Sequence, residues 1–244
     1  MSPGRPPRGP RTGARILDGA RELFDRDGTA RVTTNHIAAH VGISPGNLYY
    51  WYRGKEQIIR ALWDRYAAAQ AGLLSDDAEP GGGFLGPDGP TALVGRLAAQ
   101  ARLDEEYRFL ARELPALVHL DPLLRASVEA AHDRRTSVLT TVVRAWRADG
   151  VLAHVTDERL ADLVAALLLV TDASSARFPH AGHAGHAGQA GHAGPAAHAG
   201  HAAGDVHPDA ARLLTAVLEP YLAGPVPAVI RPADATAGHD RPPG

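Results

Sequence analysis

The sequence lacks cysteine, has a single lysine and is poor in aromatic side chains. The absence of cysteine from all 244 residues excludes a disulfide scaffold, thiolate metal sites and a cysteine nucleophile. Aromatic residues make up 5% of the chain, so part of it is not expected to contribute to a core. The longest apolar run, 163–170, is far too short to span a bilayer, and the N-terminus has no apolar signal segment. We therefore expect a cytoplasmic protein with no membrane partner.

Positive charge is concentrated near the N-terminus. The net charge of the whole chain is −2, yet residues 1–60 hold ten basic and five acidic side chains. The remainder of the chain carries an excess of acidic residues. A basic block attached to an acidic body predicts a module that binds a polyanion.

The hydrophobic pattern predicts an all-α protein, because apolar residues recur at helical spacing and no stretch alternates as a strand would. The predicted order is a flexible basic arm over 1–11, a helical domain over 12–74, a Gly- and Pro-rich linker over 75–90, a second helical domain over 91–223 and a loose tail over 224–244. Inside the second domain, residues 180–204 consist mainly of His, Ala and Gly. We expect this insertion to be disordered, because it has no large apolar residue to bury.

Capping residues divide the first domain into four predicted helices. Thr12 and Thr33 are predicted N-caps, and Ser44 followed by Pro45 marks the start of a third helix. The fourth helix is expected to begin near Lys55. Glycines that follow the apolar runs are expected to end the first two helices.

Residues 33–59, TTNHIAAHVGISPGNLYYWYRGKEQII, combine two short helices with a tight turn at Gly42. The helix after the turn begins with small polar residues. This is the layout of a helix-turn-helix, whose second helix presents its N-terminal side chains to the major groove of DNA. Backbone N–H groups at helix starts suit phosphate oxygens, and the basic excess supplies a salt-dependent attraction to the duplex.

The first domain resembles the N-terminal domain of the TetR/AcrR family of bacterial transcriptional regulators. The resemblance rests on ARILDGARELF at 14–24, VTTNHIAAHVGIS at 32–44 and GNLYYWYRGKEQII at 46–59. The rest of the chain resembles the family in layout. The resemblance implies a helix-turn-helix domain followed by a helical ligand-binding and dimerisation domain, with no cofactor. It implies a homodimeric repressor that binds a near-palindromic operator in double-stranded DNA and is released by a small-molecule effector.

The resemblance also assigns residues to the DNA interface. The ten implied DNA-binding residues are Thr33, Thr34, Asn35, Ser44, Pro45, Gly46, Asn47, Tyr49, Tyr50 and Lys55. Thr33 caps the second helix, 44–47 forms the leading turn of the recognition helix, and Lys55 corresponds to a phosphate-contacting lysine. Trp51 departs from the family pattern, which usually has His or Phe at this position. Its indole is expected to pack on the first or the fourth helix or to lie against the DNA backbone.

The second domain is expected to provide the dimer interface and the effector pocket. The helix predicted over 157–177 is apolar around most of its circumference, so it is expected to pack against a partner subunit or inside its own chain. The residues assigned to the dimer interface are Leu160, Leu163, Val164, Leu167, Leu214, Val217 and Leu218. The candidate lining of the effector pocket is Phe109, Leu114, Leu117, Val118, His119, Val138, Val142 and Trp146.

Histidines offer an alternative function. Neutral imidazoles bind transition metals, so His180, His183, His186 and His192 are the candidate ligands of a metal-responsive regulator or metal-binding protein. We favour a repeat expansion in a tolerant surface loop, because other residues replace histidine at two positions of the regular repeat. His36 and His40, four residues apart on a predicted helix, form a weaker candidate pair. No phosphate-binding loop or His-Glu-x-x-His sequence occurs, and we expect no enzymatic activity.

Overall fold

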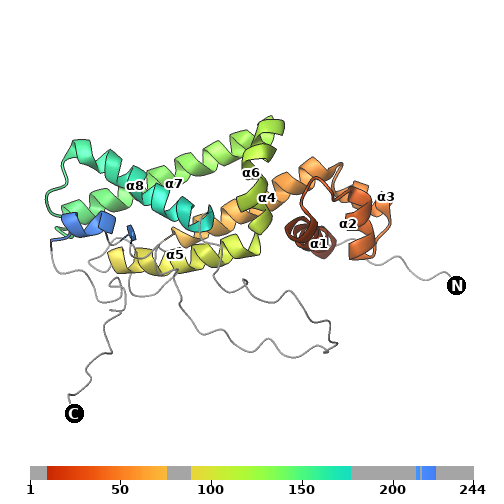
Figure 1. Ribbon diagram of the computed structural model, residues 1–244, viewed down its shortest axis with the longest axis horizontal. Coiled ribbons are helices and arrows are strands. Elements are labelled where there is room, and N and C mark those ends of the chain that lie inside the picture. Colours follow the sequence, from red (N-terminus) through yellow and green to blue (C-terminus); the bar gives the residue numbers. More distant parts are fainter. Residues whose placement is uncertain (1–9, 76–88, 177–212, 215, 224–244) are drawn as a thin grey trace, which may run out of the picture. The chain divides into compact units, whose positions relative to one another are not determined.

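The computed structural model describes residues 10–75, 89–176, 213–214 and 216–223 (Figure 1). The helices are α1 (Pro10–Asp27), α2 (Thr34–Val41), α3 (Pro45–Trp51), α4 (Lys55–Leu73), α5 (Gly89–Glu106), α6 (Arg108–Leu120), α7 (Pro122–Ala148) and α8 (Asp157–Ala176), followed by the short 3-10 helix η2 (Glu219–Tyr221). Within these residues the only β-type pairing is an isolated antiparallel bridge between Leu152 and Leu222. The predicted all-α class is confirmed. None of the described helices is long and apolar enough to cross a membrane.

The chain divides into two compact units. The first comprises residues 1–73 and 102–135, and the second comprises 74–101 and 136–244. The division therefore differs from the boundary predicted at the 75–90 linker, of which 76–88 lies outside the described residues. Helix α6 and the first half of α7 belong with the helix-turn-helix, because their apolar side chains share a core with α1 and α4.

The core of the first unit forms along the predicted face of α1. Ile16, Ala20 and Phe24 are fully buried there, and Leu23 is 4% exposed. Leu48 of α3 and Leu62 of α4 are also fully buried in this core. The remaining buried members are Val32, Ile37, Ala38, Ile58, Ile59, Trp63, Tyr107, Phe109, Leu110, Leu124 and Ala131.

The capping residues position the short helices. The Thr33 side chain accepts a hydrogen bond from the His36 backbone N–H, and the His36 side chain accepts one from the Thr33 N–H, which completes a capping box. Gly42 ends α2 with φ of 71°, a left-handed conformation that favours glycine. Helix α1 begins at Pro10 rather than after the predicted cap Thr12, since proline is well tolerated in the first turn of a helix.

Helices α1 and α2 cross at a glycine. A Cβ atom on Gly19 would lie 2.6 Å from Val41 Cγ2 and 3.1 Å from His40 Cδ2. Arg15 strengthens the crossing by donating from Nη2 to the Val41 carbonyl at 2.9 Å. The absence of a side chain at Gly19 thus sets how closely α2 can approach α1.

The residues that the sequence assigned to the dimer interface belong to the core of the second unit. Leu160, Leu163, Val164, Leu167, Leu214 and Leu218 are at most 6% exposed inside their own chain, and Val217 packs against them. Trp146 at the centre of this core is fully buried. Their own chain therefore covers these side chains, and the assignment of these seven residues to a subunit interface stays a prediction. An apolar stripe in a sequence indicates burial but does not identify the surface that buries it.

Helix α7 begins directly after Asp121, whose side chain caps it. Asp121 Oδ1 accepts hydrogen bonds from the backbone N–H groups of Leu123 at 3.0 Å and Leu124 at 3.1 Å. The other carboxylate oxygen lies 2.6 Å from Arg60 Nη1 of α4. Burial opposes ionisation, but the hydrogen bond from Leu124 and the Arg60 guanidinium outweigh it and lower the pKa of Asp121 below 3.8.

We expect Asp121→Ala to lower the free energy of unfolding by about 1–2 kcal/mol at pH 7, because the change removes a helix cap and an ion pair. A carboxyl whose pKa is lowered by folding stabilises the protein fully above its unfolded pKa of 3.8. That contribution is lost as the pH falls through the lower folded value. Urea unfolding at several pH values should therefore show the variant and the wild type converging in strong acid. Asp133→Ala, at an exposed position of α7, is the control, and an equal loss from both variants would contradict the argument.

Candidate DNA interface

The recognition helix α3 presents its first turn to solvent. Ser44 Oγ accepts a hydrogen bond from the Asn47 N–H at 3.2 Å, and Pro45 occupies the first turn. Both residues and Gly46 are exposed, while Leu48 on the opposite side of the helix is fully buried. Burial of Leu48 therefore anchors the predicted leading turn to the core, and residues 44–46 of that turn are open to solvent.

Helix α2 and helix α3 are joined by two of the predicted DNA-binding residues. Thr34 Oγ1 lies 3.1 Å from the hydroxyl oxygen of Tyr49. Tyr49 is 49% exposed and Tyr50 is 64% exposed, and Asn35 at the start of α2 is also exposed. The structure thus brings the start of α2 and the outer side of α3 together on one surface.

Lys55 lies at the start of α4 and is half-buried. Its Nζ donates to the Thr29 carbonyl oxygen at 2.7 Å, which fixes the ammonium beside the turn that links α1 and α2. An ammonium has three N–H donors, so two remain beyond the one given to Thr29. The sequence predicted a role for Lys55 but did not indicate its hydrogen-bond partner Thr29, which lies 26 residues away in the chain.

Trp51 packs on α1. A Cβ atom on Gly13 would lie 3.2 Å from Trp51 Cε3, and both Trp51 and Tyr52 pack against the first core. The Trp51 Nε1 atom is buried without a hydrogen-bond partner among the described residues, and burial raises the pKa of Tyr52. Among the three expected placements of the indole, packing on the first helix is confirmed.

Residues 42–46, Gly-Ile-Ser-Pro-Gly, match the Gly-x-Ser-x-Gly pattern of serine hydrolases. In a hydrolase this serine lies on a sharp turn between a strand and a helix. Here Gly42 ends one helix and Ser44 caps the next. The hydroxyl accepts the Asn47 N–H at 3.2 Å, so the serine serves as a helix cap.

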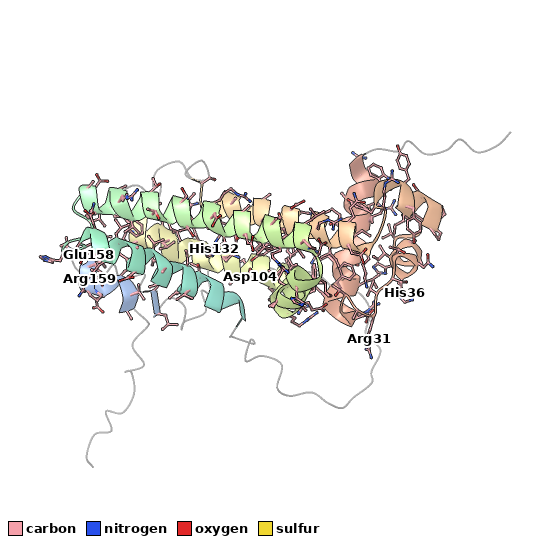
Figure 2. All side chains as sticks on the ribbon, turned by 90° about the horizontal axis from the view of Figure 1, so that it is seen from above. Arg31, His36, Asp104, His132, Glu158 and Arg159 are labelled. Atoms are coloured by element: carbon pink, nitrogen blue, oxygen red, sulfur yellow. The ribbon has the colours of Figure 1, made fainter. Side chains whose placement is uncertain are left out.

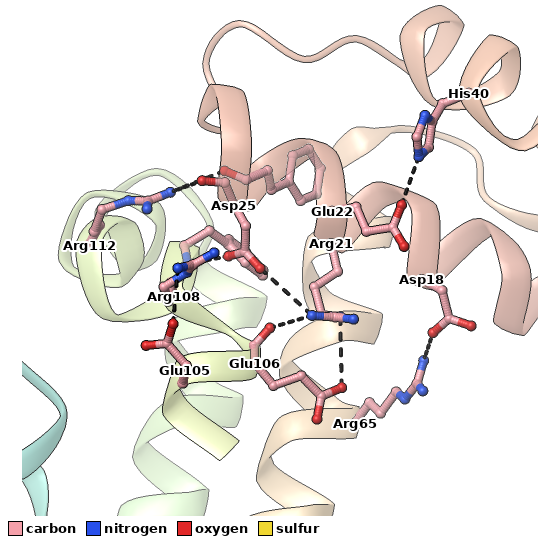
Figure 3. A network of polar contacts seen from close by, with 12 residues as sticks. Asp18, Arg21, Glu22, Asp25, His40, Arg65, Glu105, Glu106, Arg108 and Arg112 are labelled. Atoms are coloured by element: carbon pink, nitrogen blue, oxygen red, sulfur yellow. Dashed lines mark hydrogen bonds and ion pairs between the residues drawn. The ribbon is translucent and has the colours of Figure 1, made fainter. Parts of the chain in front are cut away.

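The histidines of α2 have structural partners. His36 belongs to the capping box, and His40 Nε2 lies 2.9 Å from Glu22 Oε2 of α1 (Figure 3). The described residues contain no group of three or more potential metal ligands. The candidate ligands His180, His183, His186 and His192 lie outside the described residues.

One basic side chain near this surface escaped the sequence analysis. Arg31 and His36 lie beside each other (Figure 2), and both line an open groove of about 460 Å³ together with Arg26 and His40. Arg31 is exposed and precedes the helix cap Thr33 by two residues. Its place directly before a capping box was the signal that could have identified it.

The residues of the candidate effector lining are divided between the two units. Phe109, Leu114, Leu117 and Val118 pack in the core of the first unit, whereas Val142 and Trp146 pack in the core of the second. His119 is exposed, and Val138 is 36% exposed. The effector lining stays a prediction, and within the first unit one face of α6 is buried against α1.

The two parts of the chain match models of a single regulator family. Residues 16–62 match "Bacterial regulatory proteins, tetR family" and residues 92–194 match the TetR "Bacterial transcriptional repressor" domain. The two ranges together span more than half of the chain. The chain belongs to the TetR family of bacterial transcriptional regulators. Residues 16–62 are therefore its DNA-binding domain, and the structure supplies this domain with an exposed recognition helix.

Solved structures of TetR-family proteins share the fold. A regulator from Marinobacter aquaeolei is 28% identical with a TM-score of 0.57, over 66% of this chain and 77% of that one. A regulator from Rhodococcus is 21% identical with a TM-score of 0.58, over 86% and 97%. A putative regulator from Saccharomonospora viridis, solved in complex with choline, is 18% identical with a TM-score of 0.54, over 68% and 84%. TetR-family proteins are regulators rather than enzymes, and none of these comparisons supports the metal-responsive alternative.

Proposed function

We propose that this TetR-family regulator is a dimeric repressor whose affinity for a near-palindromic operator is lowered by a small ligand. The observation that supports the DNA contact most directly is the leading turn of α3, where residues 44–46 are exposed, Asn47 is half-buried and Leu48 is fully buried. A recognition helix reads base edges with residues near its N-terminus. A family of bacterial DNA-binding regulators acts on DNA inside the cell, which supports a cytoplasmic location for this protein.

The surface divides into base-reading and phosphate-binding residues. Asn47 and Tyr49 stand on α3, and we assign Asn47 to a base edge because its amide both donates and accepts hydrogen bonds. Lys55 is the first residue of α4 and Arg31 lies in the segment before α2, and we assign both to phosphates, because phosphate contacts fix register and orientation. The remaining proposed contacts are Thr33, Thr34, Asn35, Ser44, Pro45, Gly46 and Tyr50.

Replacing Asn47 and Lys55 tests this division. We expect Lys55→Ala to weaken binding to all duplexes and to reduce the slope of log K against log salt by about 0.9, the value for one phosphate. Asn47→Ala should instead relax base preference at one operator position, at a cost of about 1–3 kcal/mol. Binding of full-length variants to duplexes selected from a random pool measures both effects. Salt-independent binding, or selection of no duplex by the wild type, would contradict the proposed function.

The exposed face of α8 is the proposed subunit contact. Ala161, Ala165 and Leu169 are four residues apart and exposed, and Leu169 is 70% exposed. Residues at this spacing lie on one side of a helix. The two alanines let a second helix approach closely, and the leucine supplies apolar area. We propose this face in addition to the residues that the sequence assigned to the interface, which are covered by their own chain.

Substitutions at Leu169 and Leu167 of α8 distinguish the proposed interface from the core. We expect Leu169→Arg to yield monomers that retain the wild-type helical content and lose operator affinity, because the charge disrupts a surface contact. Leu167→Arg should instead destabilise the fold by about 3 kcal/mol or more, because it buries an unpaired charge in the core. Sedimentation and circular dichroism distinguish these outcomes. Leu123→Arg, at a 67% exposed position of α7, is the matched control, and an unchanged dimer in the Leu169 variant would show that the contact lies elsewhere.

We place the ligand in the second unit, where Trp146 and Val142 belong to the apolar core. Ligand sites are mostly apolar with a few polar groups. The choline complex shows that a protein of this fold holds a small molecule. A ligand that binds one conformation more tightly shifts the equilibrium by that difference in affinity. Measuring the affinity of the protein for its operator in the presence of each member of a panel of small molecules tests the proposal. A molecule that weakens DNA binding would support it.

A further inference from the structure

Three residues of α6 contact the C-terminal end of α1 and the turn that follows it. Phe109, Arg112 and Glu113 are three and four residues apart, so they share one side of the helix. The Phe109 N–H donates to Asp25 Oδ1 at 2.7 Å, and the rings of Phe109 and Phe24 lie 5.4 Å apart. Arg112 Nη2 donates to the Phe24 carbonyl at 3.2 Å and to the Asp25 carbonyl at 2.9 Å (Figure 3). The side chain of Arg112 thus satisfies carbonyl groups at the C-terminus of α1.

Glu113 extends this contact to the turn after α1. Its Oε2 accepts hydrogen bonds from the Thr29 backbone N–H at 3.0 Å and from the Thr29 hydroxyl. Thr29 is 5% exposed. Gly28 holds the turn with φ of +81°, and a Cβ atom there would lie 3.3 Å from Glu113 Oε1. A carboxylate that accepts two hydrogen bonds from one buried residue fixes both its backbone and its side chain.

Thr29 also forms a hydrogen bond with Lys55. Its carbonyl oxygen accepts the hydrogen bond from Lys55 Nζ at 2.7 Å. The three residues come from α6, from the turn between α1 and α2, and from the first residue of α4. All of these contacts are partly buried, so water competes with them less than at the surface.

We propose that Glu113 is a positioning residue for DNA binding, which holds the Lys55 ammonium toward the phosphate backbone through Thr29. The proposal rests on the phosphate contact assigned to Lys55 above. A lysine side chain is long and flexible, and a fixed hydrogen-bond acceptor restricts where its charge lies. Glu113 carries negative charge itself, so a direct contact with DNA would repel the duplex, and its effect on affinity must pass through its neighbours.

The test is a double-mutant cycle on the full-length chain, with a duplex that the wild type selects from a random-sequence pool. We expect Glu113→Ala to weaken binding by about tenfold and to lower the salt slope by about 0.9, the amount for one phosphate. In the Lys55→Ala background the same change should have almost no further effect, because the group it positions is gone. Glu113→Gln keeps an acceptor for the Thr29 N–H and should restore part of the affinity.

Two further variants keep the outcome unambiguous. Glu129→Ala, at an exposed position of α7, is the control and should bind as the wild type does. Thr29→Val removes the hydroxyl donor while it retains the backbone N–H, so it repeats the cycle with Lys55→Ala should Glu113→Ala fail to fold. It should weaken binding less than Glu113→Ala is expected to do.

The outcomes separate this inference from the proposed function. If Lys55→Ala binds as tightly as the wild type, the phosphate contact is wrong and the positioning role fails with it. If Lys55→Ala weakens binding but Glu113→Ala leaves affinity and salt slope unchanged, the positioning role alone is wrong. Fully additive losses in the double variant would also overturn it, since they would show that Glu113 acts without Lys55. With Thr29→Val as the substitute, an unchanged affinity overturns the role in the same way.

Discussion

Burial of Leu48 in the first core is the interaction on which the DNA-binding surface depends. Helix α3 has seven residues, and a helix of that length is not stable in water by itself. It persists because Leu48 is fully buried while the residues before it stay exposed. The Ser44 cap and the Thr34–Tyr49 contact fix its direction. Exposure of one side of the helix to DNA thus requires burial of the other.

The same core also explains the place of α6. Phe109 packs on Phe24 and Tyr107 is 3% exposed, so a helix predicted to lie in the regulatory domain completes the DNA-binding unit. Polar contacts surround this apolar contact, and nitrogens of the Arg21 guanidinium lie 3.8 Å from carboxylate oxygens of both Asp25 and Glu106 (Figure 3). The guanidinium carbon of Arg21 is 5.6 Å from the centre of the Tyr107 ring. Apolar packing tolerates small rotations, whereas hydrogen bonds and ion pairs are directional. The polar contacts therefore define the orientation of α6 on α1.

Local signals were sufficient for the predicted helices of the DNA-binding domain. Thr33, Gly42 and Ser44 act through neighbours within a few residues, and all three are found at the helix ends that the sequence predicted. The predicted start of α1, directly after Thr12, lies three residues beyond the observed start at Pro10, because helix ends are the least predictable part of a helix. The exposed sides of Tyr49 and Tyr50 were also predicted, because the family pattern fixes the register of α3.

Partners that are distant in sequence were not predictable. The periodicity of α8 correctly indicated a buried face, but Leu163 and Leu167 are buried by their own chain. Lys55 and Glu113 both contact Thr29, yet they are separated from it by 26 and 84 residues. No spacing rule links such positions, because the approach of α6 to the α1–α2 turn depends on the packing of Phe24 and Phe109. The helices and the exposed residues of the proposed DNA surface were therefore predictable from the sequence, whereas the contacts that hold this surface depend on the tertiary core.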